Sequence, residues 1–167
     1  MGCWRLAMIL IGAMFALLLA APSHANLAIR VQSSTLIYDD PSTFELSVIV
    51  QNRGGIPLVV LPQALRRVYS AVGSNSAEYS PYPGPRVPPW EGAFSLQPGQ
   101  TRTLTFVGMR DGDGSWKIEP GRYELRVILS VSGDTAKSAE EHVAHFGAAI
   151  WQGNLQSAVI LVTYSPN

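Results

Sequence analysis

Hydrophobic and polar residues alternate along this chain in short runs, and turn residues separate the runs. The clearest run covers residues 44–51, where apolar side chains occupy every second position: Phe44, Leu46, Val48 and Val50. Successive side chains of a strand point to opposite faces of a sheet, so this period of two predicts a strand with one buried face. The same pattern predicts half-buried strands at 27–32, 103–107, 123–131 and 158–163.

Two more strands complete the predicted set. Residues 56–61 are apolar enough for a central strand, and residues 67–72 are a candidate for a further one. Residues 135–146 fit either a short helix or a polar connection. Because short strands separated by Gly and Pro turns dominate, the pattern predicts an all-β fold, a single antiparallel β-sandwich.

The first 25 residues have the pattern of a secretory signal peptide. Arg5 precedes an uncharged apolar run over residues 6–21, and Pro22 and a small-x-small site at residues 23–25 follow it. The run is shorter than the roughly 20 apolar residues of a spanning helix, which favours cleavage over retention as an anchor. We therefore expect a signal peptide at 1–25, a sandwich domain at 26–167, and a periplasmic or secreted protein with no membrane span after cleavage.

Composition excludes several function classes. The chain has 12 basic and 12 acidic residues, so its formal net charge is zero, and this balance argues against a nucleic-acid binder. The single cysteine, Cys3, lies in the predicted signal. A disulfide framework and a cysteine-based zinc site are therefore not expected.

Three segments resemble immunoglobulin-like or fibronectin type III-like sandwich domains of exported bacterial proteins. They are residues 44–52, residues 96–100 together with Phe106, and residues 119–127. In such folds a Pro-Gly turn followed by Tyr, here Tyr123, resembles the tyrosine corner. Residues 151–157 resemble a recurring segment before the last strand. The resemblance implies an immunoglobulin-like sandwich and no particular activity.

Motifs for catalysis and metal binding are weak. The sequence has no Gly-x-Ser-x-Gly elbow, phosphate-binding loop or dinucleotide fingerprint, so we expect no enzyme and no cofactor. His142 and His145, after two glutamates, are too few for a zinc site and fit a solvated polar segment. Residues 111–114 fit a glycine-rich turn better than a calcium loop, because the required oxygen ligands are missing.

Residues 74–90 form a proline-rich insertion between predicted strands. It contains five prolines and four residues typical of binding surfaces: Tyr79, Tyr82, Arg86 and Trp90. Proline restricts the backbone, and stiff aromatic residues and arginine lose little entropy on binding. The segment predicts either a partner-binding loop or a cover in which Tyr82 and Trp90 pack over one end of the sandwich.

Together these observations predict a non-catalytic exported module that engages a protein partner in the cell envelope. A sheet edge or the proline-rich loop would make the contact. One alternative is a carbohydrate-binding accessory domain, with Trp90, Tyr79 and Tyr82 stacking on sugar rings. A second is a protease-inhibitor-like domain that presents the stiff loop to an enzyme cleft.

Overall fold

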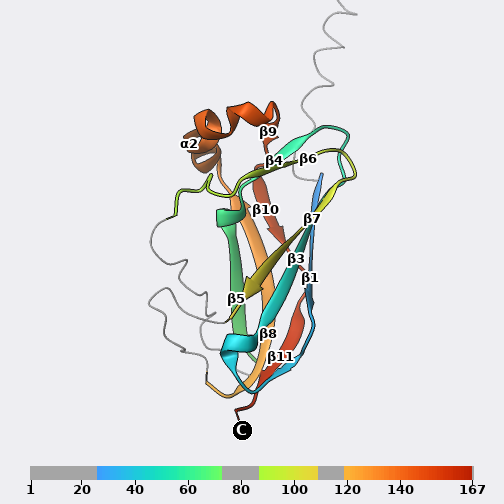
Figure 1. Cartoon of the computed structure of the whole chain (residues 1–167), viewed down its shortest axis with the longest axis vertical. Coiled ribbons are helices and arrows are strands. Elements are labelled where there is room, and N and C mark those ends of the chain that lie inside the picture. The colour runs from blue at the N-terminus through green and yellow to red at the C-terminus, as the bar shows by residue number, and fades with distance from the viewer. Residues whose placement is uncertain (1–25, 73–86, 109–118, 167) are drawn as a thin grey trace, which may run out of the picture.

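Two mainly antiparallel sheets pack face to face in the computed structural model, with a small third sheet and a helix at one end (Figure 1). The structure describes residues 26–72, 87–108 and 119–166. The predicted signal at 1–25 and most of the proline-rich insertion lie outside these residues. The elements are β1 (Leu27–Ser33), β2 (Ile37–Tyr38), η2 (Pro41–Thr43), β3 (Glu45–Asn52), β4 (Leu58–Val60), η3 (Pro62–Ala64), β5 (Leu65–Ala71), β6 (Phe94–Leu96), β7 (Thr101–Val107), β8 (Gly121–Val131), α2 (Gly133–Val143), η4 (Ala144–Phe146), β9 (Ala149–Ile150), β10 (Gly153–Gln156) and β11 (Ile160–Tyr164).

The strand order is that of an immunoglobulin-like sandwich. One sheet has the order β1-β3-β7, and in the other β8 lies between β5 and the consecutive strands β10 and β11. These sheets correspond to strands A-B-E and C-F-G of the immunoglobulin fold. The prediction of an all-β sandwich is confirmed. The strand predicted at 67–72 begins two residues earlier and ends one residue earlier, as Leu65–Ala71, and takes the place of strand C. Two short pairs, β2 with β11 and β4 with β9, are parallel.

The core lies between the two sheets and is filled by the alternating residues that the sequence predicts. The inward side chains of β3 and β8 are almost fully enclosed, and those with no exposed surface are Leu46, Val48, Val50, Leu125, Val127 and Leu129. Burying one such aliphatic side chain contributes about 1.5–3 kcal/mol. Because no cysteine lies within residues 26–167, this apolar packing takes the role that disulfides have in many exported domains.

The small sheet closes one end of the sandwich. It has the order β6-β4-β9, so the predicted central strand at 56–61 is a shorter strand, β4, between two neighbours. Trp151 follows β9, is 1% exposed, and donates its backbone N–H to the carbonyl of Val59 at 2.9 Å. The segment 151–157 thus begins with a core residue that joins the small sheet to the main one.

Asn52 ties the end of β3 to this small sheet. Its side chain is fully buried, and Nδ2 donates to the carbonyls of Ile56 at 2.8 Å and Leu96 at 2.9 Å. Oδ1 accepts a hydrogen bond from the N–H of Gly54 at 2.9 Å. The amide is therefore satisfied on both sides, as a buried polar group must be. The turn beside it has Gly99 at a φ of 77°, a left-handed conformation that glycine adopts without strain.

The predicted tyrosine corner is present. Tyr123 Oη donates a hydrogen bond of 2.7 Å to the carbonyl of Glu119, four residues earlier. Burial raises the pKa of Tyr123, and the charge of Glu119 raises it further. The corner therefore fixes the start of β8 in the geometry that the Pro-Gly-x-Tyr sequence predicts.

A β-bulge shapes the last strand. Gln156 pairs with Ile128 and Ile160 pairs with Leu125, so the segment that joins β10 to β11 has one residue more than the stretch of β8 opposite it. Ser157 fills the extra position: its N–H donates to the carbonyl of Val127 at 2.9 Å, and its Oγ accepts from the Val127 N–H at 3.0 Å. The serine hydroxyl thus replaces a backbone acceptor, and the ladder continues across the bulge without an orphaned amide.

Residues 135–146 are helical, which decides between the two predicted alternatives. Helix α2 begins two residues earlier, where Ser132 Oγ accepts the N–H of Thr135 at 3.1 Å and caps it. Its buried face consists of Ala136, Ala139 and Val143. A turn of 3₁₀ helix, η4, ends at Gly147, whose φ is 61°. Among the described residues, no helix is long and apolar enough to cross a membrane.

Candidate functional site

The outward side of the β1-β3-β7 sheet is a mostly polar surface, which we call the three-stranded face. Because inward residues alternate with outward ones, every second residue of each strand belongs to it. Most of its side chains are small or uncharged: Ala28, Arg30, Gln32, Glu45, Ser47, Ile49, Gln51, Thr101, Thr103, Thr105 and Val107. Arg30 and Glu45 are its charged members, and it contains no aromatic side chain.

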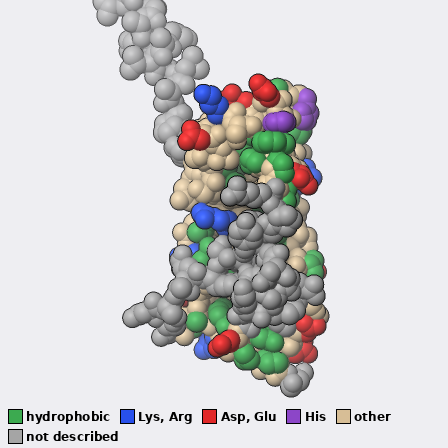
Figure 2. Space-filling view, turned by 90° about the vertical axis from the view of Figure 1, so that its left-hand side faces the viewer, with side chains coloured by type: hydrophobic (Ala, Val, Ile, Leu, Met, Phe, Trp, Pro, Cys, Tyr) green, Lys and Arg blue, Asp and Glu red, His purple; other side chains and the backbone are tan. Residues whose placement is uncertain are grey.

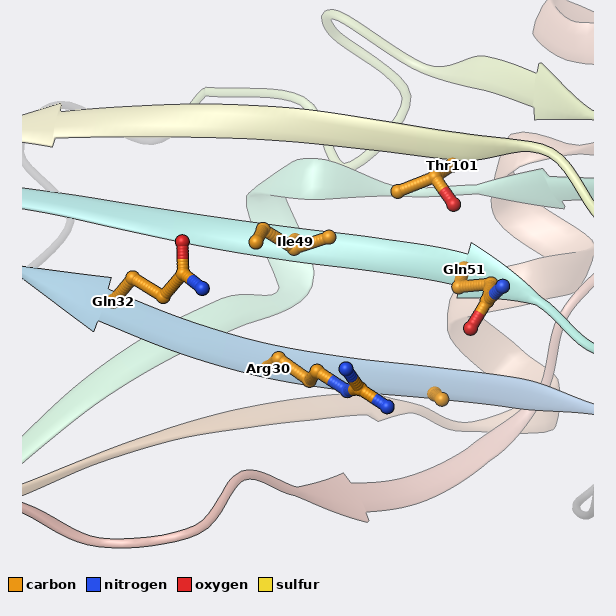
Figure 3. Close-up of a pocket in the computed structure, with 6 residues that line it drawn as sticks. Arg30, Gln32, Ile49, Gln51 and Thr101 are labelled. Carbon is orange, nitrogen blue, oxygen red and sulfur yellow. The ribbon is translucent and has the colours of Figure 1, made fainter.

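A hollow of about 220 Å³ lies on this face, lined by Ala28, Arg30, Gln32, Ile49, Gln51 and Thr101. The register explains it, because Ala28 pairs with Gln51 and Gln51 pairs with Thr101, so the smallest residue lies in a row of longer ones. Figure 3 shows the Arg30 side chain extending along β1 on the side of Gln51. Such pockets usually enclose about 300–1,000 Å³ for drug-sized ligands, so this hollow suits a single small group.

A hydrogen bond orients one of the polar groups of the hollow, the amide of Gln51. Gln51 Oε1 accepts a hydrogen bond from Arg53 Nε at 3.2 Å, which leaves the NH₂ of Gln51 as a donor. Within the described part of the chain, the guanidinium of Arg30 has no hydrogen bond or ion pair. The hollow therefore presents donors from three neighbouring strands.

Strand β7 is an edge strand with few of the features that usually protect an edge. Among the described residues it pairs with β3 alone, over seven residues. It contains no proline and a single charged residue, Arg102. Native edges are commonly blocked by charges, proline, bulges or short strands. Strand β7 is long and regular, and Val107 at its end is 70% exposed.

The direction of the free backbone groups of β7 follows from the bonds at both ends of its ladder. The N–H of Asn52 donates to Gln100 O at 3.0 Å, and the N–H of Gly108 donates to Phe44 O at 2.7 Å. Hydrogen-bonded and non-bonded pairs alternate in an antiparallel ladder. The even-numbered residues of β7 therefore direct their backbone N–H and C=O groups to β3. The residues that direct their N–H and C=O groups to the free edge are Thr101, Thr103, Thr105 and Val107.

The inward residues of β7 are only partly covered, in contrast to those of β3. Leu104 and Phe106 pack against the core while keeping some exposed surface. Arg67 of β5 crosses the opening between the sheets: its Nη1 donates to the carbonyl of Gly108 at 2.7 Å, and its guanidinium lies 5.4 Å from the Phe106 ring centre. Arg102 lies 4.4 Å from the ring centre of Phe94. Two arginines thus shield aromatic rings at this edge.

The four residues that the sequence singles out for partner binding divide into two groups. Tyr79, Tyr82 and Arg86 lie outside the described residues. Trp90 is described, and its ring stacks on that of His142 in α2, with 3.8 Å between ring centres and 6° between planes. Trp90 also packs against the core cluster while remaining partly exposed. One face of the Trp90 ring is therefore occupied, and a binding role for these four residues stays a prediction.

The two histidines near the end of α2 belong to different contacts. His142 meets Trp90, whereas His145 packs against Phe146 with 4.1 Å between ring centres. Both are exposed, and Figure 2 shows the histidines at the surface of one end of the molecule. Within the described ranges, no group of three or more His, Cys, Asp or Glu side chains could hold a metal ion. Residues 111–114 are outside these ranges.

A second hollow, of about 350 Å³, lies between the end of α2 and β9. Small and aliphatic residues form much of its lining, with Glu140 and Gln152 as its polar members; the others are Val143, Ala144, Ala148, Ala149 and Ile150. Its ionisable group is a carboxylate, whereas that of the hollow on the three-stranded face is a guanidinium. The two hollows thus differ in the sign of their charge.

Sequence reasoning did not identify the three-stranded face. Most of its members are visible in the alternation of residues 27–32, 44–51 and 103–107, whereas Thr101 precedes the predicted strand. The proximity of these residues depends on which strands are neighbours. Gln51 and Thr101 are paired although they are far apart in the sequence. The one local signal was the row of polar outward residues opposite a fully apolar inward row.

No protein-family model matches the chain, and no curated protein matches it. Among solved structures, a CARDB domain from Pyrococcus furiosus, in complex with di-metal ions, is 14% identical with a TM-score of 0.44, covering 89% of this chain and 100% of that one. A β-glucosidase from Erythrobacter marinus is 15% identical with a TM-score of 0.42, covering 83% of this chain. A β-glucosidase from Listeria innocua in complex with glucose is 13% identical with a TM-score of 0.38, also covering 83% of this chain.

The chain spans 15% of the Erythrobacter glucosidase and 16% of the Listeria enzyme. At this identity and these TM-scores, the likenesses carry no conclusion about activity or ligand. The description of this protein as an immunoglobulin-like sandwich therefore rests on its own strand order.

Proposed function

We propose that this protein is a non-catalytic binding module of the cell envelope, and that it holds a protein partner by adding a strand of that partner to the free edge of β7. The observation that carries the proposal is the edge itself. It is seven residues long, regular, free of proline and almost free of charge. The envelope location rests on the signal-peptide pattern of residues 1–25.

Strand addition would satisfy both the backbone and the side chains of β7. The N–H and C=O groups of Thr101, Thr103, Thr105 and Val107 would bond to the incoming strand. Side chains of that strand would lie beside Leu104 and Phe106 and cover their remaining exposed surface. Backbone bonds would supply affinity, and the pockets between alternate side chains would supply selectivity. The interaction needs no cofactor and involves no reaction.

The carbohydrate-binding alternative depends on exposed aromatic rings. The described member of its aromatic set, Trp90, already has one face against His142. The three-stranded face offers no aromatic ring for stacking on sugar. These two observations favour a protein partner. The protease-inhibitor alternative depends on residues 74–90, most of which lie outside the described ranges.

A proline substitution at the free edge tests the proposal. Thr103→Pro removes one N–H that points away from β3, so the ladder with β3 keeps its bonds while an incoming strand loses a donor and meets the pyrrolidine ring. Thr103→Val is the matched control, because it keeps the backbone N–H and removes only the hydroxyl. We expect an envelope protein retained by the wild type and by Thr103→Val to be lost with Thr103→Pro.

The measurement is affinity retention from envelope extract, with mass spectrometry of the retained protein and circular dichroism of each variant. Equal retention by Thr103→Pro would contradict strand addition at β7. If deleting residues 76–89 abolishes retention of the partner while the Thr103→Pro variant still retains it, the contact is made by the proline-rich loop and not by β7. Glycan-array binding that Trp90→Ala abolishes would favour the carbohydrate-binding alternative.

A further inference from the structure

The hollow on the three-stranded face collects positive charge and hydrogen-bond donors. Arg30 lines it with a guanidinium that has no partner among the described residues. Arg53, beside the lining residue Gln51, donates its Nε–H to Gln51 Oε1 at 3.2 Å, so the NH₂ of Gln51 remains to donate. Thr101 adds a hydroxyl from the third strand. A group that binds here must therefore accept hydrogen bonds and carry negative charge.

No carboxylate lines the hollow, so its own residues leave the charge unbalanced. Glu45 is the acidic residue of the three-stranded face and lies four residues from Ile49 along β3. At about 3.3 Å per residue, this separation is about 13 Å, beyond the reach of an ion pair with Arg30. Arg30 in the hollow and Arg53, bonded to the lining residue Gln51, thus place local positive charge on a chain with no net charge.

The shape of the hollow limits the size of the ligand. Ala28 has no long side chain, which leaves space between Arg30 and the row of Gln51 and Thr101. Ile49 provides an apolar part of the lining. A planar carboxylate on a short aliphatic stem matches this arrangement, because the guanidinium fork binds a carboxylate through two parallel bonds and the stem meets Ile49.

We propose that this hollow binds the carboxylate of an acidic side chain presented by the protein partner. The source of the carboxylate rests on the proposed function, whereas the hollow lies on the outward face of the sheet and shares Thr101 with the free edge of β7. The two contacts can therefore be tested separately.

The test is an NMR titration of the isotope-labelled mature domain with two capped tripeptides. Acetyl-Ala-Glu-Ala-amide carries one carboxylate, and acetyl-Ala-Gln-Ala-amide is its neutral counterpart. We expect saturable shifts of the Arg30 Nε–H and Gln51 NH₂ signals with the first peptide and none with the second. Raising the salt concentration should weaken the binding, since the pair is exposed.

Arg30→Gln and Arg66→Gln give matched variants, each with one charge removed. Arg66 is exposed on β5, in the other sheet. We expect Arg30→Gln to weaken binding of the glutamate peptide at least tenfold and Arg66→Gln to change it less than twofold. Because Arg30 is exposed, neither variant should alter the dispersed amide spectrum.

Three results would overturn the inference: equal shifts with the neutral peptide, unchanged binding by Arg30→Gln, or tighter binding of inorganic phosphate than of the glutamate peptide. Thr103→Pro separates the two proposals, because it leaves the lining of the hollow intact. If that variant binds the peptide normally and still retains the partner, strand addition fails while the carboxylate site stands. If the peptide titration fails while Thr103→Pro loses the partner, the opposite holds.

Discussion

Strands β8 and β7 show how differently a central strand and an edge strand of this sandwich are used. β8 has neighbours along both sides, and its inward residues Leu125, Val127 and Leu129 have no exposed surface. β7 has one neighbour among the described strands, and its inward residues Leu104 and Phe106 are only partly covered. A central strand thus supplies packing to the core, as β3 also does in the sheet of β7, whereas the edge strand β7 leaves backbone groups and polar side chains available.

Truncating one inward leucine in each of these strands should separate them most clearly in stability. Leu129→Ala in β8 should lower the free energy of unfolding by about 3–4 kcal/mol, because it opens a cavity in the closed core. Leu104→Ala in β7 should cost about 1 kcal/mol, because solvent already reaches this side chain. Urea unfolding of both variants measures the difference, and equal losses would contradict the distinction between the two strands.

The next test measures how the ionisation of Tyr69, in β5 beside β8, changes the free energy of unfolding with pH. Burial raises the pKa of Tyr69 to about 12, and the charge and hydrogen bond of Arg67 lower it in part. Unfolded tyrosine titrates near 10, so the folded state holds the proton more tightly. Stability should therefore be complete below pH 10 and fall by about 2–3 kcal/mol as the pH rises to 12.

Urea unfolding at pH 9, 10, 11 and 12 measures this loss. The Tyr69→Phe variant has no hydroxyl to ionise at this position, so its stability should fall less over the same range. A wild-type slope that matches the slope of the variant would show that Tyr69 does not contribute.

Substitutions of Asn52 test the contact between the β1-β3-β7 sheet and the small sheet. Asn52→Ala leaves the carbonyl of Leu96 and its other partners without the amide, and should cost about 2 kcal/mol. Asn52→Asp keeps the acceptor for Gly54 but places a carboxylate against two carbonyls, so it should be less stable than the alanine variant at neutral pH. Thermal unfolding ranks the variants, and an Asp variant as stable as the wild type would contradict this role.

The smallest effect is expected at the tyrosine corner. Tyr123→Phe keeps the ring and removes the 2.7 Å hydrogen bond to the carbonyl of Glu119. It should lower the free energy of unfolding by about 1 kcal/mol, the usual contribution of one hydrogen bond. Denaturant unfolding below pH 9 measures it, and a loss close to that of Leu129→Ala would show that the corner has a larger role in the fold.

The packed part of the molecule was largely predictable from sequence, because its signals are local. Alternation over residues 44–51 and 123–131 marks β3 and β8, and the Pro-Gly turn before Tyr123 marks the corner. The sequence did not distinguish a helix at 133–143 from a polar connection. The apolar face of this helix consists of two alanines and one valine, so its helical hydrophobic periodicity is weak.

The remaining features depend on contacts between distant segments. The parallel pairing of β2 with β11 involves only two residues, and no pattern of such length predicts a strand. The bulge at Ser157 depends on a hydroxyl that replaces a backbone acceptor for β8. The hollow requires that Arg30, Gln51 and Thr101 come from three adjacent strands, and the sequence alone does not specify that order.

The pairing of β2 with β11 has a mechanical consequence. The N–H groups of Thr163 and Ser165 donate to the carbonyls of Leu36 and Tyr38, each at 2.7 Å, between two strands that run in the same direction. A force that pulls β2 from its N-terminal side and β11 from its C-terminal side would slide these parallel strands past each other. Both hydrogen bonds would then carry the load together. The early strand β2 and the late strand β11 therefore resist tension in shear rather than opening one bond at a time.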